Sequence, residues 1–252
     1  ENHITKLFEY FIFRNDLCIV LKLYYITLHS YIYDLNIINK NKNYIYLKQI
    51  LHGINYLKLN NIIHCDIKPN NIIFQDTNLN RIILIDFGIS VYTKDIIDIC
   101  NKKTQTIGYR SPEIILNCMT CNKVQYNYKI DIWSVGCIAY ELFYKKRLFN
   151  SNKSIEIFIQ QNIFLDNPDY DYLKQYKEIH KLYDNIENPS YIKHDSQIYS
   201  FKRNKFIEKH TDKNYIIDLV LKCLEWNINK RINCNNAINH IESLINYKDL
   251  TH

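Results

Sequence analysis

The stretch His64-Cys65-Asp66-Ile67-Lys68-Pro69-Asn70-Asn71, followed by Asp86-Phe87-Gly88, decides how this chain is interpreted. A carboxylate, a lysine and an amide lie within six residues, and a second carboxylate comes fifteen residues after the amide. Between the two motifs, the apolar runs 72–74 and 82–85 predict a short hairpin of two strands. Such a set can accept a hydroxyl proton, neutralise a phosphoryl group in transfer and bind Mg²⁺, which are the requirements of phosphoryl transfer.

The bulk composition sets few limits beyond these motifs. A chain of 252 residues can form one large domain or two small ones, and 47% hydrophobic residues are ample for a core. Ile, Asn, Lys and Tyr are heavily used, which we attribute to their A/T-rich codons. Glycine is rare, and three of the four glycines, Gly88, Gly108 and Gly136, lie in motifs discussed here. The net charge of +6 comes from basic residues spread along the chain, so we predict no nucleic-acid partner.

The sequence shows no secretory signal and no run of eighteen apolar residues. We therefore expect an intracellular protein, cytoplasmic or nuclear, with no membrane partner. The eight cysteines are irregularly spaced. Cys118 and Cys121 have the spacing of a zinc pair, but no second pair follows to complete four ligands, so free thiols are the favoured interpretation.

The order of the expected elements indicates an α+β fold. Residues 7–13 and 17–22 are apolar and aromatic and predict two strands joined by a turn at 14–16. A short hinge follows at 22–25, and the pattern then becomes helical. Helices are expected around 47–57, 129–144, 214–226 and 233–244. The polar, tyrosine-rich stretch 166–212 is expected to be mostly loop with short helices.

Together the two opening motifs resemble the catalytic loop and the metal-binding motif of eukaryotic protein kinases. Downstream, Thr106-Ile107-Gly108-Tyr109-Arg110-Ser111-Pro112-Glu113 resembles the end of a kinase activation segment. The resemblance implies a protein-kinase-like fold, with residues 1–24 as the remnant of the small lobe and the hinge and 25–252 as the large lobe. It also implies ATP and Mg²⁺ as cofactors and proteins as substrates, and it leaves the oligomeric state open.

The resemblance assigns a role to each polar residue of these motifs. Asp66 would be the catalytic base, Lys68 would stabilise charge on the transferring phosphate, and Asn71 and Asp86 would bind magnesium. Thr106 would contact Asp66 and Lys68 from the activation segment. An isolated Asp-x-Lys is more often a surface ion pair. Kinase ancestry is favoured because Asp66, Lys68, Asn71 and Asp86 all match the kinase motifs and the expected strand hairpin lies between them.

By resemblance, six further residues are expected to hold this site together. By resemblance Glu113 should pair with Arg231, since this ion pair ties the activation segment to the large lobe in the kinase family. Burying either charge alone would cost about 3–5 kcal/mol, so the presence of both is informative. Asp131 should hold the backbone of the catalytic loop. His64 and Phe87 should belong to the apolar spine that joins the two lobes in this family, and Leu7 should be part of the same spine.

By resemblance, the nucleotide site lies around the hinge. Its expected residues are Leu21, the backbone of Lys22 and Tyr24, Thr27, Ile73 and Ile85. The glycine-rich loop, the strand lysine and the helix glutamate that complete this site in kinases are missing from the sequence, which starts at Glu1. We therefore expect a fragment of a longer reading frame that is marginally stable, binds nucleotide weakly and is inactive alone.

Smaller features resemble the dual-specificity tyrosine-regulated kinases (DYRK) of the CMGC group. They are Phe13-Arg14-Asn15-Asp16-Leu17-Cys18, Tyr109-Arg110-Ser111-Pro112-Glu113-Ile114-Ile115-Leu116 and Cys223-Leu224-Glu225-Trp226. Membership implies phosphorylation of Ser and Thr, and Arg110 would favour proline after the acceptor. The activation-loop tyrosines of that family would fall near Asn101 and Lys103, so self-activation on tyrosine is in doubt. Cys65 replaces the arginine of the common His-Arg-Asp, so a phosphate switch on that arginine is not expected.

Three functions are compatible with these residues. They are an active Ser/Thr or dual-specificity protein kinase, a pseudokinase-type scaffold, and a phosphotransferase for small molecules. Intact Asp66, Lys68, Asn71 and Asp86 favour the active kinase over the scaffold. The activation segment that ends in Ser-Pro-Glu favours protein substrates over small molecules.

Overall fold

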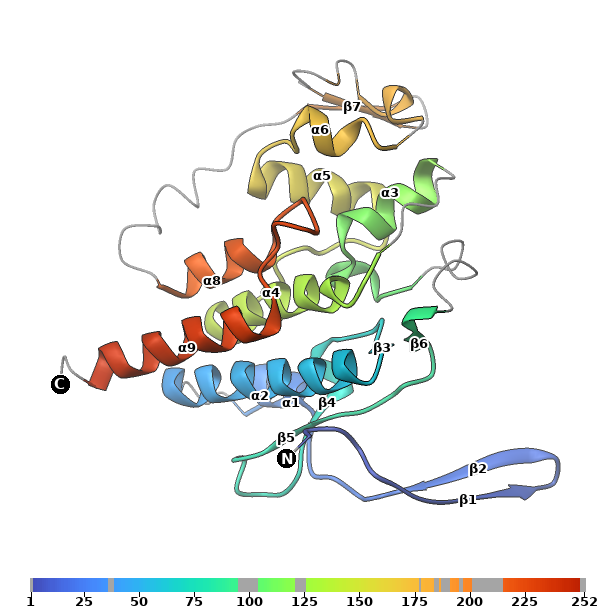
Figure 1. The fold of residues 1–252 in the computed structure, drawn as a ribbon, viewed down its shortest axis with the longest axis vertical. Coiled ribbons are helices and arrows are strands. Elements are labelled where there is room, and N and C mark those ends of the chain that lie inside the picture. The colour runs from blue at the N-terminus through green and yellow to red at the C-terminus, as the bar shows by residue number, and fades with distance from the viewer. Residues whose placement is uncertain are drawn as a thin grey trace.

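The structure is a computed structural model that describes residues 2–35, 39–94, 104–120, 126–176, 178–183, 186, 191–194, 197–200 and 215–249. It consists of a mainly helical body and a long two-stranded hairpin that projects from the body (Figure 1). This arrangement agrees with the α+β class predicted from the sequence. No helix in these described ranges is long and apolar enough to cross a membrane.

The projecting hairpin is formed by β1 (Leu7–Phe13) and β2 (Asp16–Leu21). The strands pair antiparallel from Phe13 opposite Asp16 to Leu7 opposite Leu21. Arg14 and Asn15 have φ values of 49° and 68°, which is the left-handed pair that a two-residue hairpin loop requires. Every residue of β1 is exposed. The hairpin therefore presents both of its faces to solvent in this structure.

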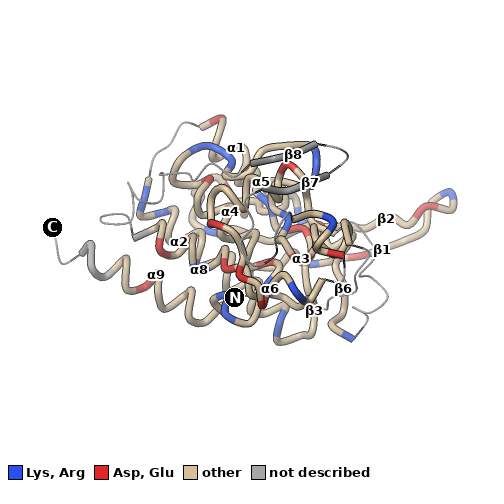
Figure 2. The backbone as a smooth tube through the Cα atoms, turned by 90° about the horizontal axis from the view of Figure 1, so that it is seen from above, with Lys and Arg blue, Asp and Glu red and all other residues tan. Residues whose placement is uncertain are grey.

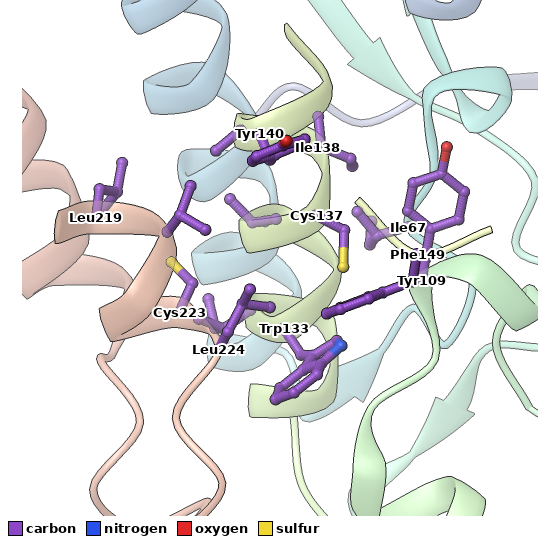
Figure 3. Close-up of a cluster of buried hydrophobic side chains, with 14 of the residues drawn as sticks. Ile67, Tyr109, Trp133, Cys137, Ile138, Tyr140, Phe149, Leu219, Cys223 and Leu224 are labelled. Carbon is purple, nitrogen blue, oxygen red and sulfur yellow. The ribbon is translucent and has the colours of Figure 1, made fainter. Parts of the chain in front are cut away.

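The body is centred on α4 (Lys129–Tyr144), which is buried on all sides along most of its length. It contacts α2 (Lys40–Leu59) and α8 (Tyr215–Cys223), and α2 in turn contacts α9 (Cys234–Asp249). In Figure 3, Trp133 and Cys137 of α4 lie among buried side chains that include Cys223 of α8 and Tyr109. A Cβ atom at Gly136 would lie 2.8 Å from the Cβ of Cys223, so glycine permits the close approach of α4 and α8.

The remaining helices cover the ends of this core. α1 (Leu28–Tyr33) begins at Thr27, whose side chain accepts the Ser30 N–H as a helix cap. α3 (Pro112–Thr120), α5 (Ser154–Leu165) and α6 (Tyr170–Leu173) lie together at the end of the body away from β1 and β2 (Figure 1). A 3₁₀ turn, η4 (Ile179–Lys181), follows α6.

Short sheets and turns carry the motifs. β4 (Ile72–Phe74) pairs with β5 (Ile82–Leu84), which is the hairpin predicted between the two motifs. β3 (Ile62–Ile63) pairs with β6 (Val91–Tyr92), so one small sheet lies just before the catalytic loop. The loop itself ends in the 3₁₀ turn η1 (Pro69–Asn71), and the activation segment contains η3 (Ile107–Tyr109).

Three of the differences between the structure and the sequence prediction are informative. β7 (Tyr191–His194) and β8 (Gln197–Ser200) form a hairpin within the stretch expected to be loop and short helices, because its mixed polar and aromatic sequence hides the alternation. α9 continues to Asp249, beyond the predicted end at 244, and Ile245 still packs against the core. α5 was not predicted, since a short apolar run such as 155–159 fits a strand as well as a helix.

Candidate active site

Asp66 is the centre of a hydrogen-bonded cluster in the loop between β3 and η1. Its Oδ1 accepts hydrogen bonds from Oγ1 and from the backbone N of Thr106, at 2.7 and 3.0 Å. Its Oδ2 accepts from Nζ of Lys68 at 2.7 Å and from Nδ2 of Asn71 at 3.0 Å. Lys68 Nζ also donates to Thr106 Oγ1 at 2.8 Å. The structure thus joins the catalytic-loop motif to the activation segment at the residues that the sequence analysis selected.

The charge state of Asp66 follows from this cluster. Asp66 is only 8% exposed, and burial by itself raises the pKa of its carboxyl. The hydrogen bond and positive charge of Lys68 and the hydrogen bonds from Thr106 outweigh burial, so the pKa of Asp66 lies below its ordinary value. The side chain is therefore ionised at neutral pH, which is the state in which a carboxylate can accept a proton.

Asp131, in the first turn of α4, holds the catalytic loop through its backbone. Its Oδ2 accepts the His64 N–H at 2.9 Å and its Oδ1 accepts the Cys65 N–H at 3.0 Å. Complete burial raises the pKa of Asp131 to about 7, although both backbone hydrogen bonds act to lower it. Cys65 has a φ of 68°, and its carbonyl accepts the backbone N–H of Gln105 at 2.9 Å. The loop is therefore fixed at consecutive residues from α4 and from the activation segment.

His64 connects the catalytic loop to the second motif. Its Nε2 donates to the carbonyl of Ile85 at 3.1 Å, and its ring lies 4.8 Å from the ring of Phe87. Its Nδ1 accepts the backbone N–H of Asp66 at 3.3 Å. Burial lowers the pKa of His64, so the ring is neutral with its proton on Nε2, the tautomer that both hydrogen bonds require.

Asp86 and Asn71, the expected magnesium ligands, are linked through the backbone. The Ile85 N–H donates to the Asn71 carbonyl at 3.0 Å. The Asn71 amide donates from Nδ2 to the carbonyl and to Oδ2 of Asp66, so its Oδ1 lies on the other side of the amide. Asp86 is exposed, has a φ of 64°, and its Oδ1 accepts the Gly88 N–H at 3.3 Å. An amide oxygen and a carboxylate fit Mg²⁺, which usually takes one or two protein carboxylates together with substrate phosphates.

A zinc site finds no support in the part of the chain that the structure describes. These residues contain no group of three or more His, Cys, Asp or Glu side chains that could hold a metal. Cys118 is an exposed free thiol, and Cys121 lies outside the described residues. The positions 101 and 103, where the activation tyrosines of the DYRK family would fall, also lie outside them.

The expected ion pair between Glu113 and Arg231 is present and buried. Arg231 Nη1 and Nη2 reach the two carboxylate oxygens of Glu113 at 2.7 and 3.0 Å, in a bidentate arrangement. The guanidinium also donates to the carbonyls of Glu225 and Lys129 and lies 5.1 Å from the ring of Trp133. The pair ties α3, which follows the activation segment, to the turn between α8 and α9.

Arg110 is held within the activation segment. Its Nε donates to the Thr104 carbonyl at 3.0 Å, its Nη2 to the Gln105 carbonyl at 2.8 Å, and its Nη1 to Ser154 Oγ at 2.8 Å. The sequence analysis did not include Gln105, which is buried and donates to the Ile130 carbonyl at 2.9 Å. No sequence signal marks this residue, because a single glutamine in a loop has no periodicity and belongs to no motif quoted above.

An apolar cavity of about 710 Å³ opens beside Asp86, between the base of the hairpin and α2. Leu7, Leu21 and Phe87 line it, so two expected spine residues and one expected nucleotide-site residue meet there. The other lining residues are Ile4, Thr5, Ile19, Tyr56, Leu57, Asn60, Ile62 and Gly88, none of which the sequence analysis assigned to a site.

The other expected nucleotide-site residues do not line this cavity, although all of them are described. They are Lys22, Tyr24, Thr27, Ile73 and Ile85. Thr27 forms an isolated bridge with Ile73, and the adjacent Tyr25 N–H donates to the Phe74 carbonyl at 3.0 Å. The hinge therefore runs alongside β4, separate from the apolar cavity.

Such a fold, with an ionised aspartate between a lysine and an amide and a second aspartate nearby, defines a phosphotransfer domain of the protein kinase type. The chain belongs to the protein kinase family, since the family model described as protein kinase domain matches residues 1–241.

The relatives of the chain are kinases of the CMGC type. It is 39% identical over 154 residues to the probable serine/threonine-protein kinase yakA of Dictyostelium discoideum, covering 60% of this chain and 10% of yakA. It is 31% identical to the serine/threonine-protein kinase ppk5 of Schizosaccharomyces pombe, covering 95% of this chain and 28% of ppk5. It is 29% identical to the dual specificity tyrosine-phosphorylation-regulated kinase 2 of Drosophila melanogaster, covering 95% and 32%. The chain thus spans between a tenth and a third of the length of these relatives.

Proposed function

We propose that the protein containing this chain is a serine/threonine protein kinase that transfers the γ-phosphate of ATP to protein hydroxyls. The observation that carries the proposal is the cluster around Asp66, in which Lys68, Asn71 and Thr106 all donate to one ionised carboxylate. These contacts orient the carboxylate and keep a cation within 2.7 Å of it. Orientation and charge are what phosphoryl transfer requires from a protein.

In this mechanism each residue has a separate task. Asp66 orients the substrate hydroxyl and accepts its proton as the oxygen attacks phosphorus. Lys68, which is only partly buried, places its positive charge beside the transferring phosphoryl group. Thr106 keeps Asp66 and Lys68 in position by bonding to both. Because these contacts exist before substrate binds, little reorganisation is needed at the moment of reaction.

Asn71 and Asp86 are the residues proposed to hold magnesium. Protein kinase domains generally use ATP with Mg²⁺, and the bound metal neutralises charge on the phosphates. The oxygen atoms of Asn71 and Asp86 are of the type that this ion prefers. We further propose that residues 1–24 belong to the small lobe and hinge, that 25–252 form the large lobe, and that the hinge residues with Leu21, Thr27, Ile73 and Ile85 contact the nucleotide.

Two finer features of the activity are also proposals. Arg110 is buried and bonded to the activation segment, and by resemblance it would favour proline after the acceptor. We also propose that this chain is inactive without further residues, because the conserved lysine strand and glycine-rich loop of kinases are not in it. The relatives include both Ser/Thr and dual specificity kinases, so Tyr acceptors belong in the test.

The experiment measures transfer of labelled phosphate from Mg-ATP to peptides with Ser, Thr or Tyr followed by Pro or Ala, using the full-length protein. We expect Asp66→Asn to reduce turnover at least about 10²-fold while the protein stays folded, as checked by circular dichroism. Asp76→Asn is the matched control, because Asp76 is an exposed turn residue that accepts the Asn78 N–H. Turnover by Asp66→Asn equal to that of the control would contradict the proposed mechanism.

A scaffold without catalysis is the second candidate, and its support is the pair Asn101 and Lys103 at the positions of the family's activation tyrosines. The scaffold hypothesis predicts that the full-length protein transfers phosphate to no peptide. It also predicts that partner proteins bind Asp66→Asn and the wild type with the same affinity. Activity that depends on Asp66 would exclude this candidate.

A further inference from the structure

The two residues proposed to bind magnesium are held in different ways. Asn71 is buried, and its amide is fixed by two hydrogen bonds to Asp66. Asp86 is exposed, and among the described residues the Gly88 N–H is the one donor to its side chain, at 3.3 Å. Lys and Arg are spread over many segments of the chain (Figure 2), and none of the described ones forms an ion pair with Asp86. The position of the Asp86 carboxylate therefore depends on the backbone turn that carries it.

The turn that carries Asp86 begins at a fixed residue. The Ile85 N–H donates to the Asn71 carbonyl at 3.0 Å, and the Ile85 carbonyl accepts from His64 Nε2 at 3.1 Å. Asp86 follows with a φ of 64°, a left-handed conformation that a residue other than glycine keeps only where surrounding contacts hold it. A turn that is held at its first residue alone can still pivot, so the direction of the Asp86 side chain also depends on the far end of the turn.

The far end of the turn is fixed by the hydroxyl of Ser90. β6 pairs antiparallel with β3, and Val91 lies opposite Ile63. The next position of this ladder would place Ser90 opposite His64. The Ser90 N–H does not extend the ladder, because it donates to the Phe87 carbonyl at 3.1 Å and closes the turn. Instead Ser90 Oγ donates to the His64 carbonyl at 3.0 Å. The segment thus changes from strand pairing to the turn without losing its contact with the catalytic loop.

His64 is the residue to which both ends of the turn are attached. Its ring Nε2 donates to the Ile85 carbonyl at the start of the turn, and its own carbonyl accepts from Ser90 at the end. Its Nδ1 accepts the backbone N–H of Asp66 at 3.3 Å. The turn that carries Asp86 is thereby held at a defined place relative to the proposed catalytic base.

We propose that Ser90 is a positioning residue for the metal site, whose hydroxyl keeps Asp86 in the place from which it binds magnesium. The proposal rests on the proposed kinase function and adds a residue that itself touches neither substrate nor metal. Changes to groups that orient a metal ligand from outside the ligand shell typically weaken metal binding about 10- to 100-fold. A role confined to folding predicts instead a change in thermal stability with no change in metal binding.

The test measures binding rather than turnover. The Kd of a fluorescent, non-hydrolysable ATP analogue for the full-length protein is determined by fluorescence anisotropy, once in saturating Mg²⁺ and once in EDTA. The ratio of the two Kd values reports how much the bound metal contributes. We expect this ratio to fall about tenfold in Ser90→Ala, with no change in the Kd measured in EDTA. Ser90→Thr keeps the hydroxyl donor and should keep the ratio of the wild type.

Ser243→Ala is the matched control for the loss of a serine hydroxyl. Ser243 also donates its hydroxyl to a backbone carbonyl, that of His240, but on an exposed part of α9. A ratio in Ser90→Ala equal to that in Ser243→Ala would overturn the proposal, and so would a loss that Ser90→Thr does not prevent. Circular dichroism checks that each variant is folded. Ser90→Cys, which has a side chain of similar size and a weaker donor, takes the place of Ser90→Ala if the alanine variant does not fold.

Asp86→Asn separates this result from a failure of the proposed function, because it changes the proposed metal ligand itself. A ratio that falls in Asp86→Asn but not in Ser90→Ala would show that only the positioning role is wrong. A ratio that Asp86→Asn leaves unchanged would show that the magnesium assignment is wrong as well.

Discussion

The β1–β2 hairpin and helix α4 are both rich in apolar and aromatic residues, but only α4 buries them. Phe8 and Ile12 of the hairpin are 58% and 76% exposed, whereas Ile132 and Trp133 of α4 are completely buried. An apolar sequence shows that a segment can be buried, but burial needs a partner surface. α4 finds partners in α2 and α8, whereas most side chains of the hairpin stay exposed.

The difference also divides the candidate site. The cluster around Asp66 is supported by the helical body around α4, which we call the packed side. The support comes through Asp131 of α4 and through Thr106. The cavity beside Asp86 instead depends on Leu7 and Leu21 of the exposed hairpin. We therefore expect the catalytic loop to be the rigid half of the site, and the half that the hairpin lines to depend on additional contacts.

The largest effect on the free energy of unfolding is expected when the buried ion pair of the packed side is broken. Arg231→Met leaves Glu113 charged and unpaired, so we expect the free energy of unfolding to fall by about 3–5 kcal/mol. Glu9→Gln on the hairpin should change it by less than about 0.5 kcal/mol. Urea unfolding of both variants measures the contrast. The double variant Glu113→Leu, Arg231→Met should recover part of the loss, and no recovery would show that packing by the arginine, rather than its charge pairing, dominates.

The next effect concerns the pH dependence of the packed side. Burial raises the pKa of Asp131 to about 7, while an unfolded aspartate has a pKa near 3.8, so the folded chain holds this proton more tightly. The contribution is therefore fully present at low pH and is lost as the pH rises through about 7. Between pH 5 and 8 we expect it to decrease by about 2–3 kcal/mol. Urea unfolding at both pH values should show this decrease in the wild type and not in Asp131→Asn.

A smaller effect distinguishes two glycines of the packed side. A Cβ at Gly136 would lie 2.8 Å from the Cβ of Cys223, so Gly136→Ala must separate α4 from α8 and should cost about 1–3 kcal/mol. A Cβ at Gly53 would meet Leu84 Cδ1, the end of a flexible side chain. Gly53→Ala should therefore cost less, because the end of the Leu84 side chain can shift, while the gain of about 1 kcal/mol in helix propensity is the same at both positions. Thermal unfolding ranks the two variants, and the reverse order would contradict this account.

The smallest effect is expected on the hairpin itself. Tyr10→Lys with Ile12→Lys replaces side chains that are 68% and 76% exposed, so the free energy of unfolding should change by less than about 0.5 kcal/mol. The same change should reduce self-association measured by light scattering, because charged residues protect an exposed strand edge. A large loss of stability would mean that the hairpin packs against another surface in solution.

The sequence predicted the parts of this molecule that depend on local pattern or on motif. The helix around 129–144 was expected from its apolar residues and the β4–β5 hairpin from its two short runs, and both are present. The pairing of Glu113 with Arg231 was inferred across 118 positions, because each residue stands in its own motif. Motif position carried that inference, since spacing alone cannot show which distant charges meet.

The remaining features depend on tertiary contacts that have no sequence pattern. Gln105 links the catalytic loop to α4 from a position that no motif marks. The hydroxyls of Tyr33 in α1 and Tyr109 in η3 converge on Glu141 of α4, so three separate elements meet there. In a chain with 22 tyrosines, composition gives no means of selecting these two.

The contacts of Asp131 also determine which substitutions the catalytic loop can tolerate. The two hydrogen bonds that hold the catalytic loop end on backbone N–H groups of residues 64 and 65, which every amino acid except proline supplies. The side chain at position 65 is therefore not needed to fix the loop. It has only to fit the small apolar space beside Ile63 and Val91. A sequence with a strong codon bias can therefore carry cysteine in place of arginine at position 65 and keep the geometry of Asp66.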